Sequence, residues 1–415
     1  IADVVLIEQD IDGHLDAAAL ERELVRYADR TLKIGSFSAA SNVTGIVTDT
    51  ARIAALLHAH GALSFWDFAA AAPYVQIQMC GGSQDDPLAY FDAVFLSPHK
   101  FIGGPSTPGV LVARRELLTN RVPVVPGGGT VAYVNPDEHR YLSDPAQREE
   151  GGTPAIVEAI RAGLVFQLQQ AVGLEVIREH EEYYLRRAVQ AWMQEPAIEI
   201  LGNLDSLRLS IVSFVVRGSG AGRYLHHNFV VALLNDLFGI QSRGGCSCAG
   251  PYGHRLLGID IERSHEFERE ITGGCEGIKP GWVRVNFNYF ISEPVFDYIV
   301  EAVRLVARHG WLLLGDYRFD PLTGLWRHRR GPAEPPMRLG QVSYDEQGRM
   351  SYPQQQDRAP ESELRRYLDE AVARFAASEA AVLGLPEDRP AAGFVSADFE
   401  HLRWFDLPAG CLLPD

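Results

Sequence analysis

A lysine stands directly after a hydrophobic segment in the stretch LSPHKFIGGPSTPG, residues 96–109. Residues 91–96 predict a short buried strand, so Lys100 is expected at the point where that strand ends. Open α/β sheets bind their ligands outside the carboxyl ends of the strands. A primary amine there is suited to form a Schiff base with a carbonyl compound. The alternative is an ordinary strand-end lysine that points into solvent.

Polar residues follow two further predicted strands: Ser41 and Asn42 come after residues 31–39, and Asp67 comes after residues 62–66. Ser97 and His99 stand just before the lysine, after the first strand. Because parallel strands bring their carboxyl ends to one edge of a sheet, these side chains are expected to converge there. An acid that keeps a pyridine nitrogen protonated, beside a lysine that forms a Schiff base, is the arrangement that pyridoxal phosphate requires. Taken alone, Asp67 fits a turn or helix cap equally well.

The elements that must position these residues alternate along the chain. Helical spacing covers residues 14–28 and 48–61, the latter with Thr48 or Asp49 as its cap, and apolar strands lie between the helices. This order predicts an α/β domain over residues 1–155, with a mostly parallel sheet flanked by helices. Residues 1–7 also read as a strand, so the sequence is expected to begin inside a domain and to lack the first part of it.

The pattern changes in the second half of the chain. A charged helix over 175–195, strands near 207–216 and 282–290, and a helix near 225–237 predict a connecting helix and a smaller α+β domain over residues 156–315. Residues 316–415 form a C-terminal extension with a YDEQGR hairpin signal and an amphipathic helix near 361–377. The sequence of this extension indicates no chemistry.

Composition limits the classes of partner. The 415 residues are 46% hydrophobic and 22% charged, which is typical of a folded globular protein. A formal net charge of -16 argues against binding to nucleic acid or to an anionic membrane surface. Five cysteines without paired CxxC units give neither a disulfide framework nor a zinc site, so a reducing, cytoplasmic compartment is expected. No apolar run approaches the length of a membrane span.

Six motifs together carry a family resemblance. In chain order they are SNVTG, WDFAAAAPYV, SPHKFIGGPSTPG, EGGTP, RGGCSCAGP and WVRVNF. This ordered set resembles the class V aminotransferases and the related cysteine desulfurases, which are fold type I pyridoxal phosphate enzymes. The resemblance covers about residues 1–310, and the order is more specific than any single motif.

The resemblance implies a role for each residue at the sheet edge. Lys100 corresponds to the Schiff-base lysine, Asp67 to the partner of the pyridinium nitrogen, Asn42 to a neighbour of the ring oxygen, Ser97 and His99 to phosphate ligands, and Thr153 to a ligand of the neighbouring subunit's phosphate in a homodimer. Ala70 stands where the family often has glutamine. The family's glycine- and threonine-containing phosphate loop and its ring-stacking residue lie upstream of the segment that matches.

The resemblance also assigns roles in the second half. Cys248 lies five residues after Arg243, as the nucleophilic cysteine does in the desulfurases, and a nearby cation favours the thiolate. Arg243 and Arg284 correspond to substrate-binding positions, with Arg284 gripping the α-carboxylate through its planar guanidinium group. The alternatives are inert cysteines and a surface ion pair. Cys246, Cys248 and His254 are too close together for a usual zinc site, so no metal is expected.

Three functions remain open at this point. The first is a pyridoxal-phosphate-dependent desulfurase that acts on a small L-amino acid and hands sulfur from Cys248 to an acceptor protein. The second is an aminotransferase that passes the amino group to a keto acid. The third is a cofactor-free remnant that serves as a structural or partner-binding module.

Overall fold

The computed structural model describes residues 2–80, 86–219, 222–331, 337–354, 359–382 and 395–412. They form two compact units. The first unit contains the residues up to Glu182 together with Gly202–Leu209, and the second contains Tyr183–Leu201 and the residues from Ser210 onward. The boundary lies within the long helix α5, Leu174–Met193. None of the described helices has both the length and the apolar composition needed to cross a bilayer.

The first unit is an α/β unit. Its elements are α1 (Ala17–Arg26), β1 (Ile34–Ser38), α2 (Thr50–Ala59), β2 (Leu63–Asp67), β3 (Ala93–Leu96), the 3-10 turn η1 (Pro98–Lys100), β4 (Val110–Ala113), β5 (Val131–Val134), β6 (His139–Tyr141), α3 (Pro145–Glu149) and α4 (Ile156–Val172). Asp49 caps α2 by accepting a hydrogen bond from the Arg52 amide, which identifies which of the two expected residues forms the cap.

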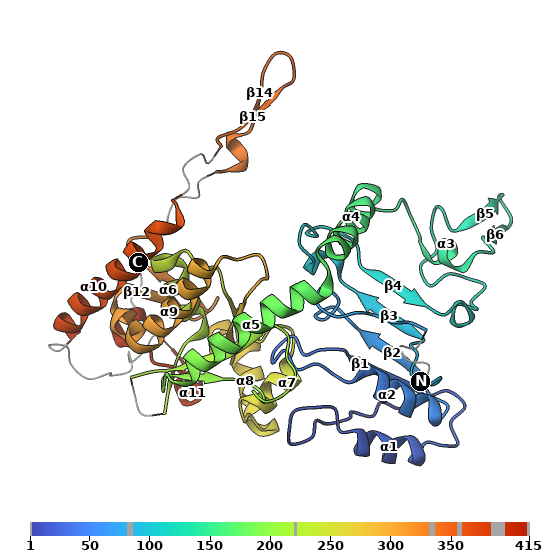
Figure 1. The fold of residues 1–415 in the computed structure, drawn as a ribbon, viewed down its shortest axis with the longest axis horizontal. Coiled ribbons are helices and arrows are strands. Elements are labelled where there is room, and N and C mark those ends of the chain that lie inside the picture. The colour runs from blue at the N-terminus through green and yellow to red at the C-terminus, as the bar shows by residue number, and fades with distance from the viewer. Residues whose placement is uncertain are drawn as a thin grey trace. The chain divides into compact units, whose positions relative to one another are not determined.

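Four strands of the first unit form one sheet in the order β1-β2-β3-β4. The first three strands are parallel, and β4 runs antiparallel to β3. Figure 1 shows these strands side by side, with α1 and α2 below them. Trp66 of β2 and Val94 of β3 are fully buried, so the two central strands pack against the core. The prediction of a mostly parallel sheet flanked by helices is confirmed.

The strand predicted at the start of the chain is wrong for the residues that can be described. Residues 2–7 lie in extended chain outside any strand, while Ile1 lies outside the described residues. Val4 is 92% exposed and Leu6 is 68% exposed. An apolar segment becomes a strand only when a neighbouring strand pairs with it and covers its side chains. No strand of the described chain does so here.

The second unit has a sheet and several helices. Its elements are β7 (Ile198–Ile200), β8 (Ile211–Arg217), β9 (Tyr224–Leu225), α6 (His227–Phe238), β10 (Arg243–Gly245), α7 (Gly250–Leu256), α8 (Ile261–Thr272), β11 (Trp282–Asn286), α9 (Glu293–His309), β12 (Tyr317–Asp320), β13 (Leu325–His328), β14 (Ser343–Tyr344), β15 (Met350–Ser351), α10 (Leu364–Val382) and α11 (Ala397–Leu402). The antiparallel sheet has the order β10-β11-β8-β7, and β9 pairs with β8.

Residues 316–415 contribute to the core of the second unit. Trp326, Phe399 and Phe405 belong to the same buried cluster as Phe214 of β8. Helix α10 lies beside α9 (Figure 1). The strands β14 and β15 pair around the YDEQGR turn, which confirms the predicted hairpin. The C-terminal extension that the sequence sets apart therefore packs as part of this unit, because its aromatic side chains fill space beside the sheet.

Two adjacent histidines are buried where this extension packs. His226 caps α6 and His227 is its first residue, and His226 stacks on Trp404 with ring centroids 5.4 Å apart. His226 Nδ1 accepts a hydrogen bond from the Asn228 amide, and its Nε2 donates to the Gly277 carbonyl. Burial away from water lowers the pKa of His227 to about 4 and that of His226 well below the usual value, since the charged imidazolium loses its solvation.

Stability is expected to fall as the pH is lowered towards 4. A histidine in the unfolded chain titrates near pH 6.5, so between about pH 6.5 and 4 the unfolded state binds more protons than the folded state. From pH 7.5 to 5.5 the His227 contribution to the free energy of unfolding should shrink by about 1.4 kcal/mol. Urea unfolding of the parent and of His227→Gln at both pH values measures this difference. Equal pH dependence in the two proteins would contradict the assignment.

Candidate active site

Lys100 lies in a rigid turn at the carboxyl end of β3. The turn η1 is closed by hydrogen bonds from the Lys100 amide to the Ser97 carbonyl and from the Phe101 amide to the Pro98 carbonyl, both 3.0 Å. Phe101 is buried and meets Phe166 of α4 edge to face, with ring centroids 5.1 Å apart. Pro98 and Phe101 are therefore fixed in the core, while the Lys100 side chain is exposed.

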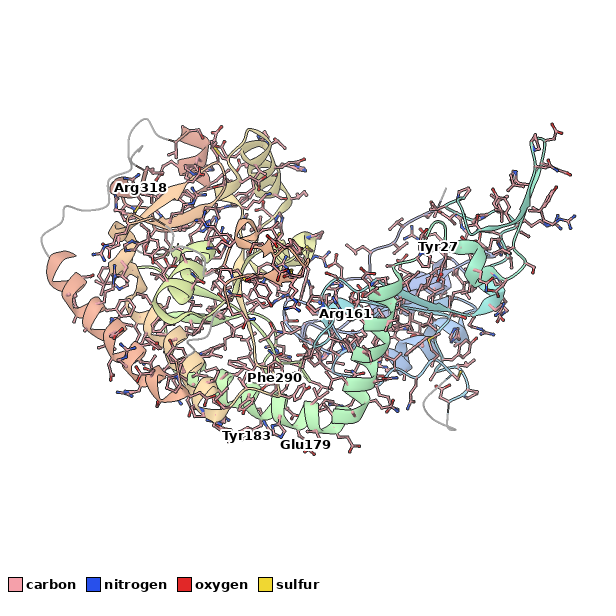
Figure 2. The ribbon with its side chains drawn as sticks, turned by 90° about the horizontal axis from the view of Figure 1, so that it is seen from above. Tyr27, Arg161, Glu179, Tyr183, Phe290 and Arg318 are labelled. Atoms are coloured by element: carbon pink, nitrogen blue, oxygen red, sulfur yellow. The ribbon has the colours of Figure 1, made fainter. Side chains whose placement is uncertain are left out.

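The glycine-rich segment after Lys100 folds back against the same turn. A Cβ atom at Gly104 would lie 2.0 Å from the Pro98 carbonyl oxygen, so only glycine fits this position. Thr107 Oγ1 donates to the Gly104 carbonyl at 2.7 Å. Arg161, labelled on α4 in Figure 2, donates to the Pro105 carbonyl at 2.9 Å. Helix α4 thus supports the loop that follows the lysine.

Asp67 lies on the strand next to the lysine turn. It is the last residue of β2, and its register partners are Ser38 of β1 and Phe95 of β3. Its Oδ1 accepts a hydrogen bond from the Ala69 amide at 2.6 Å, which orients the exposed carboxylate. Because β2 and β3 are parallel neighbours, Asp67 and the turn of Lys100 share one edge of the sheet.

The remaining predicted cofactor residues occupy two places. Asn42 lies half-buried in the turn after β1, where the Ser41 hydroxyl accepts hydrogen bonds from the Val43 and Thr44 amides at 3.1 Å. Ser97 and His99 flank Pro98 at the end of β3, half-buried and exposed, respectively. These three residues lie at the same sheet edge as Lys100. Thr153 lies elsewhere, exposed in the segment that precedes α4.

The residues at this edge have the chemistry that pyridoxal phosphate needs. An amine can bond the aldehyde carbon, a carboxylate can accept a hydrogen bond from the protonated ring nitrogen, and a hydroxyl and an imidazole can bind phosphate oxygens. The carboxylate comes from the end of β2, and the amine, the hydroxyl and the imidazole come from the turn after β3. The donor set of the first unit therefore fits this cofactor.

A second cluster lies in the second unit. Arg243 of β10 and Arg284 of β11 are directly opposite each other in the antiparallel pair. Side chains at opposite positions point to the same face of a sheet, with Cβ atoms about 4.5–5.5 Å apart. An anion that binds between two guanidinium groups on one face can accept charge-assisted hydrogen bonds from both. An amino acid carboxylate is such an anion.

Cys248 lies beside one of these arginines. Arg243 Nη2 is 3.8 Å from Cys248 Sγ, and the cysteine side chain is exposed. An exposed cysteine sulfur can reach a bound molecule and act as a nucleophile. The second unit therefore combines a cysteine sulfur with two arginines that can hold a carboxylate.

Several features of these clusters escape sequence reasoning. The register that places Arg243 opposite Arg284 depends on strand pairing between segments about 40 residues apart, which no local pattern encodes. The hydrogen bond from Arg161 to the loop that follows Lys100 also joins distant segments. Gly104 gives a readable signal in principle, since a glycine-rich run directly after a strand-end lysine marks a close backbone approach.

The model of the family "Aminotransferase class-V" matches residues 1–263. A probable cysteine desulfurase from Halobacterium salinarum is 30% identical over 268 residues, which cover 64% of this chain and 59% of the relative. A cysteine desulfurase from Dickeya dadantii is 30% identical over 240 residues, covering 58% and 53%. The chain thus spans between about half and three fifths of the length of these relatives.

Solved structures show the same fold. A cysteine desulfurase from Thermococcus onnurineus in its apo form superposes with a TM-score of 0.58 at 25% identity, covering 73% of this chain and 66% of that one. A cysteine desulfurase from Escherichia coli gives a TM-score of 0.54 at 24% identity, covering 72% and 64%. The first unit makes up less than half of the chain. Both matches cover more than that share, so both similarities extend into the second unit.

Proposed function

The chain belongs to the class V aminotransferase family, and from this premise we propose that it is a pyridoxal-phosphate-dependent cysteine desulfurase. The observation that carries the proposal is Cys248 beside Arg243, which lies opposite Arg284. A transaminase has no need of a thiol at its carboxylate site. The names of the relatives support the same reaction.

The first unit would hold the cofactor. Lys100 would bind its aldehyde carbon through Nζ, Asp67 would keep the ring nitrogen protonated, and Asn42 would contact the ring oxygen. Ser97 and His99 would bind phosphate oxygens. When bound, the cofactor supplies an electron sink for the bonds around the substrate's Cα. The Lys100 amine, once released, would accept the Cα proton of the substrate at Nζ.

The second unit would hold the substrate and take its sulfur. Arg284 and Arg243 would bind the α-carboxylate of cysteine by charge-assisted hydrogen bonds. The Cys248 thiolate would attack the substrate's sulfur, so that the new S–S bond forms as the substrate's C–S bond breaks. The products are alanine and a persulfide on Cys248, and an acceptor protein with a reactive thiol would then receive the outer sulfur.

The test is a product analysis. The purified chain is supplied with pyridoxal phosphate and L-cysteine, and alanine, sulfide and keto acids are measured. Alanine that appears together with a persulfide on the peptide of residues 244–255 is the expected result. A keto acid formed from other amino acids, without alanine from cysteine, would identify an aminotransferase instead. A colourless protein that forms none of these products would identify a structural or partner-binding module.

We propose in addition that the protein works as a homodimer in the cytoplasm, with Thr153 reaching the partner subunit's phosphate site. An exposed apolar stripe on α4 supports a contact between copies. Its members are Ile156, Val157, Ile160, Leu164 and Leu168. Spacing of three and four residues places them on one side of the helix, next to the segment that carries Thr153. Light scattering of the purified chain tests the assembly state.

A further inference from the structure

Two cysteines share one tight turn at the end of β10. Cys246 and Cys248 are both exposed, and Ser247 between them is buried. The Ala249 amide donates a hydrogen bond to the Cys246 carbonyl at 3.0 Å, which closes a four-residue turn. The two thiols therefore protrude from one turn, while the residue between them anchors it to the protein.

The turn has an unusual backbone for its sequence. Ser247 and Cys248, its two central residues, have φ angles of 52° and 59°. Positive φ at both central positions defines a type I′ turn, which glycine, asparagine and aspartate normally occupy. Each other residue in this region costs about 1–2 kcal/mol. The strained conformation must therefore be held in place by the surrounding fold.

This backbone brings the two cysteines within reach of each other. A residue in a helical conformation of either hand separates the Cα atoms of its two neighbours by about 5.4 Å. A disulfide spans Cα atoms about 4.4–6.8 Å apart. An extended Ser247 would hold the two Cα atoms farther apart and near the upper limit of that range. The left-handed turn therefore favours a bond between Cys246 Sγ and Cys248 Sγ.

We propose that Cys246 resolves the persulfide on Cys248, an inference that rests on the proposed desulfurase function. The Cys246 thiolate, having lost its proton to solvent, attacks Sγ of Cys248. The bond between the two Sγ atoms forms, the bond from Cys248 Sγ to the outer sulfur breaks, and that sulfur leaves with the electron pair as HS⁻. The outer sulfur is reduced and the two cysteines are oxidised to a disulfide.

A dithiol reductant must then restore the pair. Thiol–disulfide exchange with a small or protein dithiol returns both cysteines to the reduced form and oxidises the dithiol in turn. Exposed and strained disulfides are the ones most easily reduced. In this cycle the protein releases free sulfide as well as handing sulfur to an acceptor. The conformation of one turn thus makes sulfide release an intramolecular reaction.

The experiment loads the persulfide without using the enzymatic reaction. The reduced chain is treated with inorganic polysulfide, desalted, and followed for released sulfide and for the mass of the tryptic peptide of residues 244–255. The parent should release sulfide while this peptide loses the outer sulfur and two hydrogen atoms, which leaves a disulfide peptide two hydrogens lighter than the unmodified reduced one. Cys246→Ser should keep its persulfide more than about tenfold longer, because a thiol in the same turn acts at millimolar or higher effective concentration.

The controls separate this inference from the proposed function. Cys80→Ser removes an exposed cysteine of the first unit and should release sulfide as the parent does. If the parent keeps its persulfide as long as Cys246→Ser, or releases sulfide without the disulfide peptide, the inference is overturned. Alanine formation from cysteine is measured in a separate reaction with pyridoxal phosphate. Its absence counts against the desulfurase function, whereas the polysulfide result reports on the cysteine pair alone.

Discussion

Lys100→Ala is expected to abolish covalent attachment of pyridoxal phosphate and to reduce alanine formation by roughly 10²–10⁴-fold or more, since the lysine is both the attachment point and the proposed base. The fold should remain, because the Lys100 side chain is exposed and the turn is held by Pro98 and Phe101. Exposed substitutions of this kind usually change stability by less than about 0.5 kcal/mol. Borohydride reduction followed by peptide mapping measures the attachment.

The lysine content makes this assay unusually clear. The chain has only three lysines, which are Lys33, Lys100 and Lys279. Lys33 Nζ donates to the Arg30 carbonyl at 3.2 Å, and Lys279 forms an ion pair with Glu276. Lys33→Ala is therefore a matched control in the same unit, and it should retain the adduct on Lys100. An adduct that maps to Lys33 or Lys279 in the parent would disprove the assignment.

The sequence predicts local structure well where local rules decide it. Asp49 caps its helix by accepting from the Arg52 amide in the first turn, and the strand at residues 93–96 follows from a short apolar run between turn residues. The same apolar signal fails at residues 2–7, because a strand also requires a neighbour to pair with. Propensity describes a segment, whereas pairing depends on the rest of the chain.

The role of the C-terminal extension lies beyond local rules for a similar reason. The aromatic residues Trp326, Phe399 and Phe405 give no separate signal in the sequence, yet they belong to the same buried cluster as Phe214. Trp326 and Phe405 both meet His226, a residue from a distant part of the sequence. A region without motifs therefore looks like an addition in the sequence and turns out to belong to the hydrophobic core. Loss of this extension would expose the buried histidines of α6.

For the candidate site as well, the sequence predicts the features that local rules decide and not those that depend on distant segments. The residue types at the sheet edge can be predicted, because parallel topology alone brings strand ends together. The pairing of Arg243 with Arg284 depends on the register of β10 and β11, and the left-handed Ser247 depends on the packing around its turn. The assigned roles of these residues stay predictions until the variants are measured.

Cys248→Ser is expected to reduce alanine and sulfide formation from cysteine by a factor on the order of 10³ or more, as loss of a nucleophile does in other enzymes. A serine hydroxyl is a far poorer nucleophile for sulfur than a cysteine sulfur, and the substitution leaves Arg243 beside the position. The replacement keeps a side chain of similar size in the exposed, left-handed position, so the turn should persist. Alanine and sulfide are measured after equal loading with cofactor.

Two comparisons make the result specific to the nucleophile. Cys248→Ser should still carry the cofactor on Lys100 after borohydride reduction, because the thiol has no part in that attachment. Cys80→Ser, which also replaces an exposed cysteine by serine, should form alanine at the parental rate. If Cys248→Ser forms alanine as fast as Cys80→Ser, sulfur is not removed by this thiol and the desulfurase proposal fails. Keto acid production that both variants retain would then identify the protein as an aminotransferase in which Cys248 has no catalytic role.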